Sequence, residues 1–257
     1  MVVPTDVMFA VDRGDIAVVE SWLNNAGPGA VNDRCDAGYT CLHRSMMALT
    51  GLRHSSREDV ELARFLISRG ADVNLCVTDA WTPLHFACFW NCGSAEMVSL
   101  LLQAGSALEA RTTLIGHSYY PDSTPLGTLL GGLRDRNVED EVAMSNFRGS
   151  LIALLRAGAS LHNCSRGKSA IIIMRDHLMN DSTLAANEHY IACRETLAGV
   201  REHGSYKRYL RAPHREFLRF RSLLVRGRAK TNELHEKIAR LPNGACWKVL
   251  SYWREDN

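Results

Sequence analysis

The chain has 257 residues, of which 46% are hydrophobic and 23% are charged, and its formal net charge is +2. This composition excludes a wholly disordered chain, because there is ample apolar surface to bury, and no apolar run approaches the roughly 18 residues that would span a bilayer. The N-terminus has neither a basic segment nor a long apolar core, so we expect no signal peptide and an intracellular protein, cytoplasmic or nuclear, whose eight cysteines are reduced.

The first predicted unit is a helical segment at residues 7–25, which we interpret as the N-terminal cap of a repeat array. After it, a phrase that begins with threonine recurs at intervals of 42 residues, at Thr40, Thr82 and Thr124. The threonine hydroxyl can accept a hydrogen bond from a backbone N–H one turn into a helix. Pro83 and Pro125 follow two of these threonines, and proline has its φ already set for the first helical turn. Each phrase therefore predicts the start of a helix.

A second phrase follows each threonine phrase and predicts the end of a second helix. It reads LISRGADVN at 66–74, LLQAGSALE at 101–109 and LLRAGASLH at 154–162. Its glycine suits the left-handed position that ends many helices, and the small residue after it allows a tight turn. Each unit is therefore predicted to contain two helices, with a turn that leads to the next unit.

The unit at residues 78–109 keeps the phrase Thr82-Pro83-Leu84-His85-Phe86-Ala87 intact, and this phrase resembles that of the ankyrin-repeat family. The resemblance extends over about five units, at residues 7–31, 36–74, 78–109, 120–161 and 165–201. It implies an all-α solenoid of helix–turn–helix units with short β-turn or hairpin fingers over residues 1–203, followed by a basic helical tail at 204–257. It also implies that His43 and His85 are structural and hydrogen-bond to the threonine hydroxyl or to a neighbouring turn.

The chain departs from the family pattern in spacing and in sequence. The 42-residue spacing exceeds the usual period by about 9 residues, and we expect the excess in three loops, at 49–59, 111–123 and 131–149. Extra loop length costs little free energy, because closure entropy grows only logarithmically. Cys41 stands where proline is usual and Gly127 stands where histidine is usual, so we expect these repeats to be weaker than the one that begins at Thr82.

In the ankyrin-repeat family, partner proteins contact the finger residues before the threonine phrase and the far end of the first helix. Carried over to this chain, the resemblance assigns partner binding to seven residues: Tyr39, Met47, Asp79, Trp81, Phe89, Trp90 and Tyr120. We expect Trp81 to be exposed, because finger turns project into solvent. Phe89 and Trp90 either line the concave face or pack under the insertions at 49–59 or 131–149.

No motif in the chain predicts a catalytic, cofactor or metal site. The run Gly167-Lys168-Ser169 lacks the earlier glycine of a phosphate-binding loop, because His162 occupies that position. His85, Cys88 and Cys92 do not have the spacing of a zinc finger or ribbon. We therefore expect a protein without enzyme activity, cofactors or bound metal.

The C-terminal part of the chain is basic. Residues 201–230 carry ten Lys or Arg and two Glu, a net charge of +8, and residues 231–257 are balanced, so the first 200 residues carry −6. Residues 214–226 have the apolar spacing of an amphipathic helix. Such a helix can cap the last repeat, as repeat arrays require. It can also bind an acidic partner or nucleic acid through its arginines, although we do not expect nucleic acid as the main partner.

A third interpretation of the tail is docking to a ubiquitin ligase. Ankyrin-repeat proteins that recruit elongin and cullin end in a SOCS box, which opens with a helical Leu and a small residue four positions later and closes on Leu-Pro. Leu218 and Ser222 resemble its start, and Leu241 and Pro242 resemble its end or the opening of an F-box. Phe217 departs from the pattern, because it occupies a place that is usually small.

Together these features predict a monomeric, non-catalytic module that binds an unidentified partner protein through its fingers and concave face. One alternative is a substrate-recognition adaptor of a cullin-type ubiquitin ligase, in which the repeats choose the substrate and the tail docks the ligase. The other alternative is binding of nucleic acid or an acidic partner through residues 201–230.

Overall fold

The computed structural model describes residues 2–27, 29–47, 57–89, 94–113, 120–135 and 139–226. Over these residues the chain forms eleven α-helices, four short 3-10 helices and isolated β-bridges, and no strand. The all-α fold class is therefore confirmed. The chain divides into two compact units, residues 1–198 and 199–257, whereas the boundary that we predict at 203 stays a prediction.

The first unit contains ten of the helices, the last of which crosses the boundary. They are α1 (Thr5–Asp12), α2 (Ile16–Ala26), α3 (Cys41–Ser45), α4 (Arg57–Ser68), α5 (Pro83–Phe89), α6 (Ala95–Gln103), α7 (Pro125–Gly131), α8 (Glu141–Ala157), α9 (Ala170–Asn180) and α10 (Glu188–His203). The 3-10 helices are η1 (Ala30–Asn32), η2 (Thr78–Ala80), η3 (Gly132–Asp135) and η4 (Ser182–Ala186).

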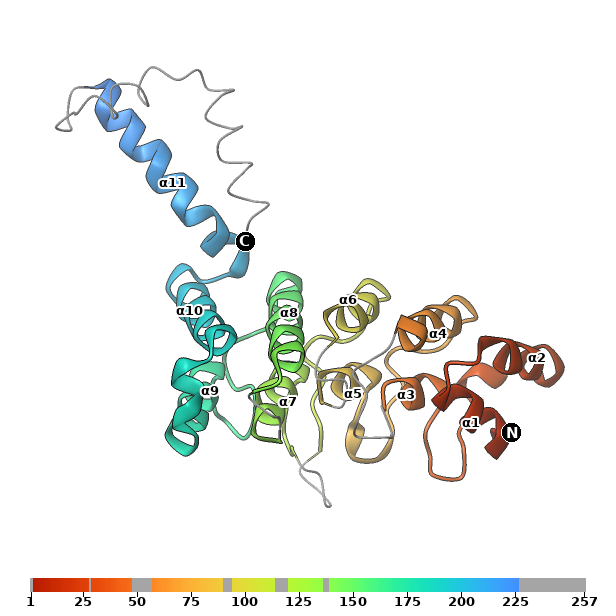
Figure 1. The fold of residues 1–257 in the computed structure, drawn as a ribbon. Coiled ribbons are helices and arrows are strands. Elements are labelled where there is room, and N and C mark those ends of the chain that lie inside the picture. The colour runs from red at the N-terminus through yellow and green to blue at the C-terminus, as the bar shows by residue number, and fades with distance from the viewer. Residues whose placement is uncertain are drawn as a thin grey trace. The chain divides into compact units, whose positions relative to one another are not determined.

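The helices of this unit lie in two rows, as Figure 1 shows. The first helices of the repeats pack in the order α1, α3, α5, α7, α9, and among the second helices α4 packs on α6 and α6 on α8. The first four pairs also pack internally, as α5 does on α6. Apolar side chains such as Leu42, Leu84 and Leu101 are at most 1% exposed, so the core runs between the rows and is complete only where repeats touch.

Side chains cap the helices at the predicted positions. The hydroxyls of Thr40 and Thr124 accept hydrogen bonds from the backbone N–H three residues later, at 3.3 and 3.2 Å. The hydroxyl of Thr82 does the same at 3.4 Å. At the other end, Gly158 follows α8 with φ of 100°, a left-handed conformation that closes the helix at little steric cost.

Polar side chains that follow the second helices join successive repeats. The Asn32 amide donates to the carbonyl of Gly70 at 3.2 Å and accepts from the N–H of Asp72 at 2.8 Å. Asn74 makes the same two bonds to the next repeat, at 3.1 and 2.7 Å, and the Glu109 carboxylate accepts from the repeat after that at 2.8 Å. These bonds fix the spacing between repeats.

The predicted insertion at 131–149 is only partly a loop. Only residues 132–140 separate α7 from α8, and residues 141–149 form the first half of α8. The Asp140 carboxylate caps this helix by accepting from the N–H of Ala143 at 3.0 Å, and Met144 and Phe147 are fully buried. Helical spacing of buried residues therefore extends α8 into the segment. Much of the predicted insertion at 49–59 lies outside the described residues.

The second unit contains the end of α10 and the helix α11 (Tyr206–Val225). The Tyr209 ring packs over Gly199, where a Cβ would overlap it, and it lies 6.2 Å from the His203 ring. The helix expected at 214–226 begins eight residues earlier and contains Pro213. Over the described residues, no helix has the length and apolar character needed to cross a membrane.

Candidate protein-interaction surface

Two finger turns of similar geometry precede α3 and α5. In the first, the Cys35 N–H donates to the carbonyl of Tyr39 at 2.8 Å. In the second, the Val77 N–H donates to the carbonyl of Trp81 at 2.9 Å. Both turns have a positive φ just before the aromatic residue, 84° at Gly38 and 59° at Ala80, but the second turn also has φ of 60° at Asp79. This left-handed conformation is unfavourable for most residues with a Cβ.

Trp81 is buried at 7% exposure, so the expectation that it projects into solvent is wrong. Its ring lies 5.1 Å from that of Phe86 and 5.6 Å from that of Phe89, both on α5. The physical reason is the turn itself, because Trp81 follows the two left-handed residues and its ring packs on α5. Trp81 therefore packs under the surface that it was expected to form.

Five aromatic rings from three repeats form a continuous series of contacts, which we call the aromatic row. From the first finger to the last, its members are Tyr39, Phe86, Trp81, Phe89 and Tyr120. Tyr39 lies edge-on to Phe86 at 5.9 Å, and Phe89 lies edge-on to Tyr120 at 5.3 Å. Tyr39, Phe89 and Tyr120 are half-buried, whereas Phe86 and Trp81 are buried. The row thus has a buried centre and three partly exposed members.

The other partner-binding residues expected from the sequence have different environments. Met47 and Asp79 are half-buried near the ends of α3 and of the second finger. Trp90 lies outside the described residues. For Phe89, which was expected either in the concave face or under an insertion, the described contacts are with the rings of Trp81 and Tyr120.

Gly131 allows Tyr120 to join the row. A Cβ at Gly131 would overlap the Tyr120 ring, and the Tyr120 hydroxyl donates to the Gly131 carbonyl at 3.1 Å. The Tyr120 ring is therefore held against the end of α7. This role was not predicted from the sequence, because glycine is common at the end of a helix and so gives no signal there.

The two histidines of the threonine phrases are enclosed. His43 Nδ1 lies 2.7 Å from the Thr40 hydroxyl, and His85 Nδ1 lies 2.8 Å from that of Thr82. His85 Nε2 lies 3.2 Å from the carbonyl oxygen of Ser123, in the next repeat. Burial lowers the pKa of each imidazole from 6.5 to about 4. A neutral, enclosed histidine suits a structural hydrogen bond.

The family scan identifies the repeats of this array. Residues 7–112 match a model described as ankyrin repeats, in three copies. Residues 7–112 therefore form ankyrin repeats. A comparison with curated proteins finds no relative that matches. Ankyrin repeats generally mediate protein–protein interaction and are typically non-catalytic.

Three buried cysteines and Lys168 lie in surroundings that suit a structural role. Burial raises the pKa of the Cys41, Cys164 and Cys193 thiols to about 12, so they are not thiolates at neutral pH. Lys168 pairs with Asp176 at 2.8 Å. Over the described residues, no group of three or more His, Cys, Asp or Glu is arranged to hold a metal ion.

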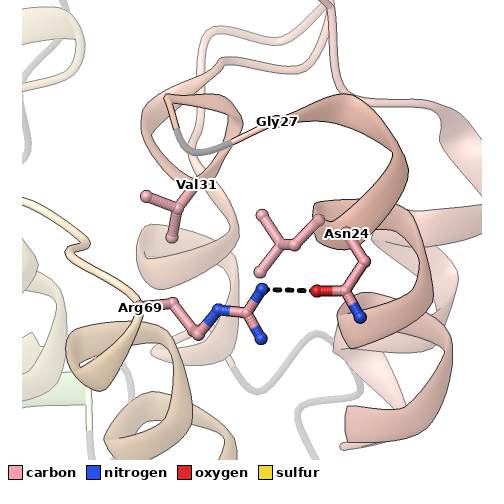
Figure 2. A pocket seen from close by; sticks show the side chains of 5 residues that line it. Asn24, Gly27, Val31 and Arg69 are labelled. Atoms are coloured by element: carbon pink, nitrogen blue, oxygen red, sulfur yellow. Dashed lines mark hydrogen bonds between the residues drawn. The ribbon is translucent and has the colours of Figure 1, made fainter.

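A small pocket of about 250 Å³ lies between the first two ankyrin repeats. Figure 2 shows Arg69 reaching across it toward Asn24, and the guanidinium donates to the Asn24 amide oxygen at 2.6 Å and to the Glu20 carboxylate at 3.3 Å. The same guanidinium lies 5.5 Å from the centre of the Phe65 ring. Because its charge and its donors are already engaged, we interpret Arg69 as a link between α2 and α4.

A larger groove of about 540 Å³ lies between α9 and α10, in the last repeat of the first unit. Its lining is mostly apolar and comes from one face of each helix, with Ile171, Met174 and Leu178 on α9 and Ile191 and Leu197 on α10. It contains no arrangement of groups that suggests chemistry.

The tail residues expected to dock a ligase are only partly described. Leu218 and Ser222 lie one turn apart on α11, and both are half-buried. Leu241 and Pro242 lie outside the described residues. The resemblance of the tail to a SOCS box or F-box is not confirmed.

Proposed function

We propose that this chain is a non-catalytic interaction module whose aromatic row and two finger turns bind a segment of another protein. The observation that carries the proposal is the row itself, because it brings three partly exposed aromatic side chains from three repeats into one connected surface. Aromatic side chains at the centre of an interface commonly supply most of its binding energy.

Within this proposal the residues of the surface have two roles. Tyr39, Phe89 and Tyr120 contact the partner, Met47 extends the contact just beyond α3, and Trp90 is a further contact expected from the sequence. Trp81 has a positioning role, because it is buried and holds Phe86 and Phe89 in place.

The test is affinity purification from the native cells with the double variant Tyr39→Ala/Phe89→Ala. We expect the captured partner to fall at least tenfold while the helical circular dichroism of the chain is retained. The matched control is Met179→Ala, which removes a side chain that is 81% exposed on α9. Unchanged capture by a folded double variant would contradict the proposal.

A second function is supported by the geometry of α11. Leu218 and Ser222 lie on one face of that helix, which is the arrangement that a ligase-docking box uses. We infer that the array then selects a substrate for a cullin-type ubiquitin ligase. Purified elongin and cullin should be captured by the full chain and lost with Ser222→Leu, which keeps the helix but fills the small position. No capture by the wild-type chain would exclude this function.

A further inference from the structure

The geometry points to a basic partner: a Lys- or Arg-bearing segment of another protein that lies along the aromatic row with its cations over the two finger turns. This inference rests on the proposed function and adds the chemistry of the ligand. It follows from the carboxylates, the cations and the backbone of the same surface.

Each finger turn carries an aspartate whose charge is not matched within the described structure. Asp36 is exposed in the first turn and Asp79 is half-buried in the second. Neither carboxylate forms a hydrogen bond or ion pair with any described residue. Both turns adjoin the aromatic row, since Tyr39, at one end of the row, ends the first turn and Trp81, at its centre, ends the second. A ligand on the row therefore meets negative charge at its edge.

The arginines on this side of the array are mostly engaged. Arg44 pairs with Asp12 through two bonds of 2.6 and 2.8 Å, and Arg111 pairs with Asp122 at 2.7 Å. Arg34 differs from these two arginines because its charge is not paired with a carboxylate among the described residues. Its guanidinium donates instead to two carbonyl oxygens, those of Gly38 at 3.0 Å and Cys76 at 2.7 Å. It holds the two turns together, and the charge balance of the turns remains negative.

Two further properties favour a cation. Partly exposed aromatic rings attract Lys and Arg through their negative faces, and Arg also stacks on them. The first 200 residues carry a net charge of −6, which favours encounter with a basic segment. An anionic or acidic ligand would be repelled by both the turns and the array.

The backbone of the second turn also indicates function. Asp79 adopts φ of 60° without being glycine, and strained backbone of this kind is concentrated at binding sites. Glycine would adopt this backbone conformation with less strain than aspartate. The presence of aspartate therefore suggests that its carboxylate has a role.

The experiment uses a phage-displayed library of random 16-residue peptides selected against the purified full-length chain. We expect selected peptides to be enriched in Lys and Arg beside apolar residues. Their Kd should rise at least tenfold with Asp36→Asn/Asp79→Asn and also with increasing salt. The matched control is Glu188→Gln/Glu195→Gln, which removes the same charge from exposed positions on α10.

The outcomes separate this inference from the proposed function. Selected peptides that are neutral or acidic but still need Phe89 would overturn the basic partner and leave the interaction surface intact. Peptides that bind equally well to Tyr39→Ala/Phe89→Ala would overturn both, and so would a selection that yields no binder. Self-association of the chain that Asp36→Asn/Asp79→Asn abolishes would assign the basic segment to a second copy and overturn a separate partner.

Discussion

At Gly127 the next repeat comes very close to α7. A Cβ there would overlap the carbonyl oxygen of Cys164, and the N–H of Thr124 donates to that same oxygen at 2.9 Å. The glycine that replaces the usual histidine therefore has a physical reason. The turn of the following repeat occupies the space that a side chain would need.

Gly127→Ala should lower the free energy of unfolding by about 3 kcal/mol, because overpacking against backbone cannot be relieved by a rotamer change. Urea unfolding followed by circular dichroism measures the loss. Gly29→Ala is the control, since a Cβ at Gly29 meets nothing within 4 Å and its φ is −86°. Equal stability of the two variants would contradict the close approach.

Trp81→Ala should destabilise the chain by about 3–5 kcal/mol, as removal of a buried large aromatic side chain does. The same measurement on Tyr39→Ala should give a clearly smaller loss, because Tyr39 is half-buried at the end of the row. A Trp81→Ala variant with wild-type melting temperature would show that the indole is a surface group after all.

At the scale of single residues, the sequence predicted the structural role of a residue correctly where that residue type has one dominant role in its context. Threonine before a helix predicted a cap, and the structure has that cap at Thr40, Thr82 and Thr124. Trp81 was misplaced, because its position depends on backbone angles at Asp79 that no residue type signals. Asn74 was missed although it ends a recurring phrase, because asparagine also has many other uses in turns.

At the scale of elements, the finger that leads into α5 is held in an unfavourable backbone conformation. Ala80 has φ of 59°, and an L-residue there costs about 1–2 kcal/mol relative to the right-handed region. Glycine adopts this conformation without the steric cost, although it loses more entropy on folding.

Ala80→Gly should therefore stabilise the chain by up to about 1 kcal/mol. The midpoint of urea unfolding should rise, and the aromatic row should keep its near-ultraviolet circular dichroism. The control in the first finger is Ala37→Gly, which makes the same substitution at a residue that does not have positive φ. A lower midpoint for Ala80→Gly would mean that the alanine methyl group makes a contact worth more than the strain.

Element boundaries were harder to predict than element types. The start of α8 lies within a segment expected to be a loop, since one aspartate cap and two buried residues extend the helix. The start of α11 lies on the far side of Pro213 from the predicted one. Proline disfavours a helix interior, so its presence within a helix cannot be predicted from local sequence alone.

At the scale of the whole molecule, buried histidines link stability to pH. His43 and His85 have pKa values of about 4 in the folded chain and 6.5 as the reference for the unfolded chain. Between these values the unfolded chain binds more protons, so stability is full above about pH 6.5 and is lost as pH falls toward 4.

Lowering the pH from 7.5 to 5 should reduce the free energy of unfolding by about 2 kcal/mol per histidine. Urea midpoints measured across this range, in the wild-type chain and in His85→Gln, report the loss. The variant should start less stable and should have the shallower pH dependence. Identical slopes would show that His85 is protonated equally in both states.

The repeat architecture itself was predictable from the sequence, because the threonine and glycine phrases recur with a fixed order and indicate paired helices. For the proposed binding surface, the sequence suggested individual members but not how they are organised. Tyr39, Phe89 and Tyr120 come from distant positions, and their connection through a buried Trp81 depends on how neighbouring repeats stack.

The bonds made by Asn32, Asn74 and Glu109 follow the second helix of each repeat, whereas the segments that join the two helices of a pair lie elsewhere in the chain. A longer or shorter link within a pair can therefore be accommodated without altering these bonds between repeats. A lineage of such chains can lengthen its loops and alter its targets without having to rebuild the scaffold.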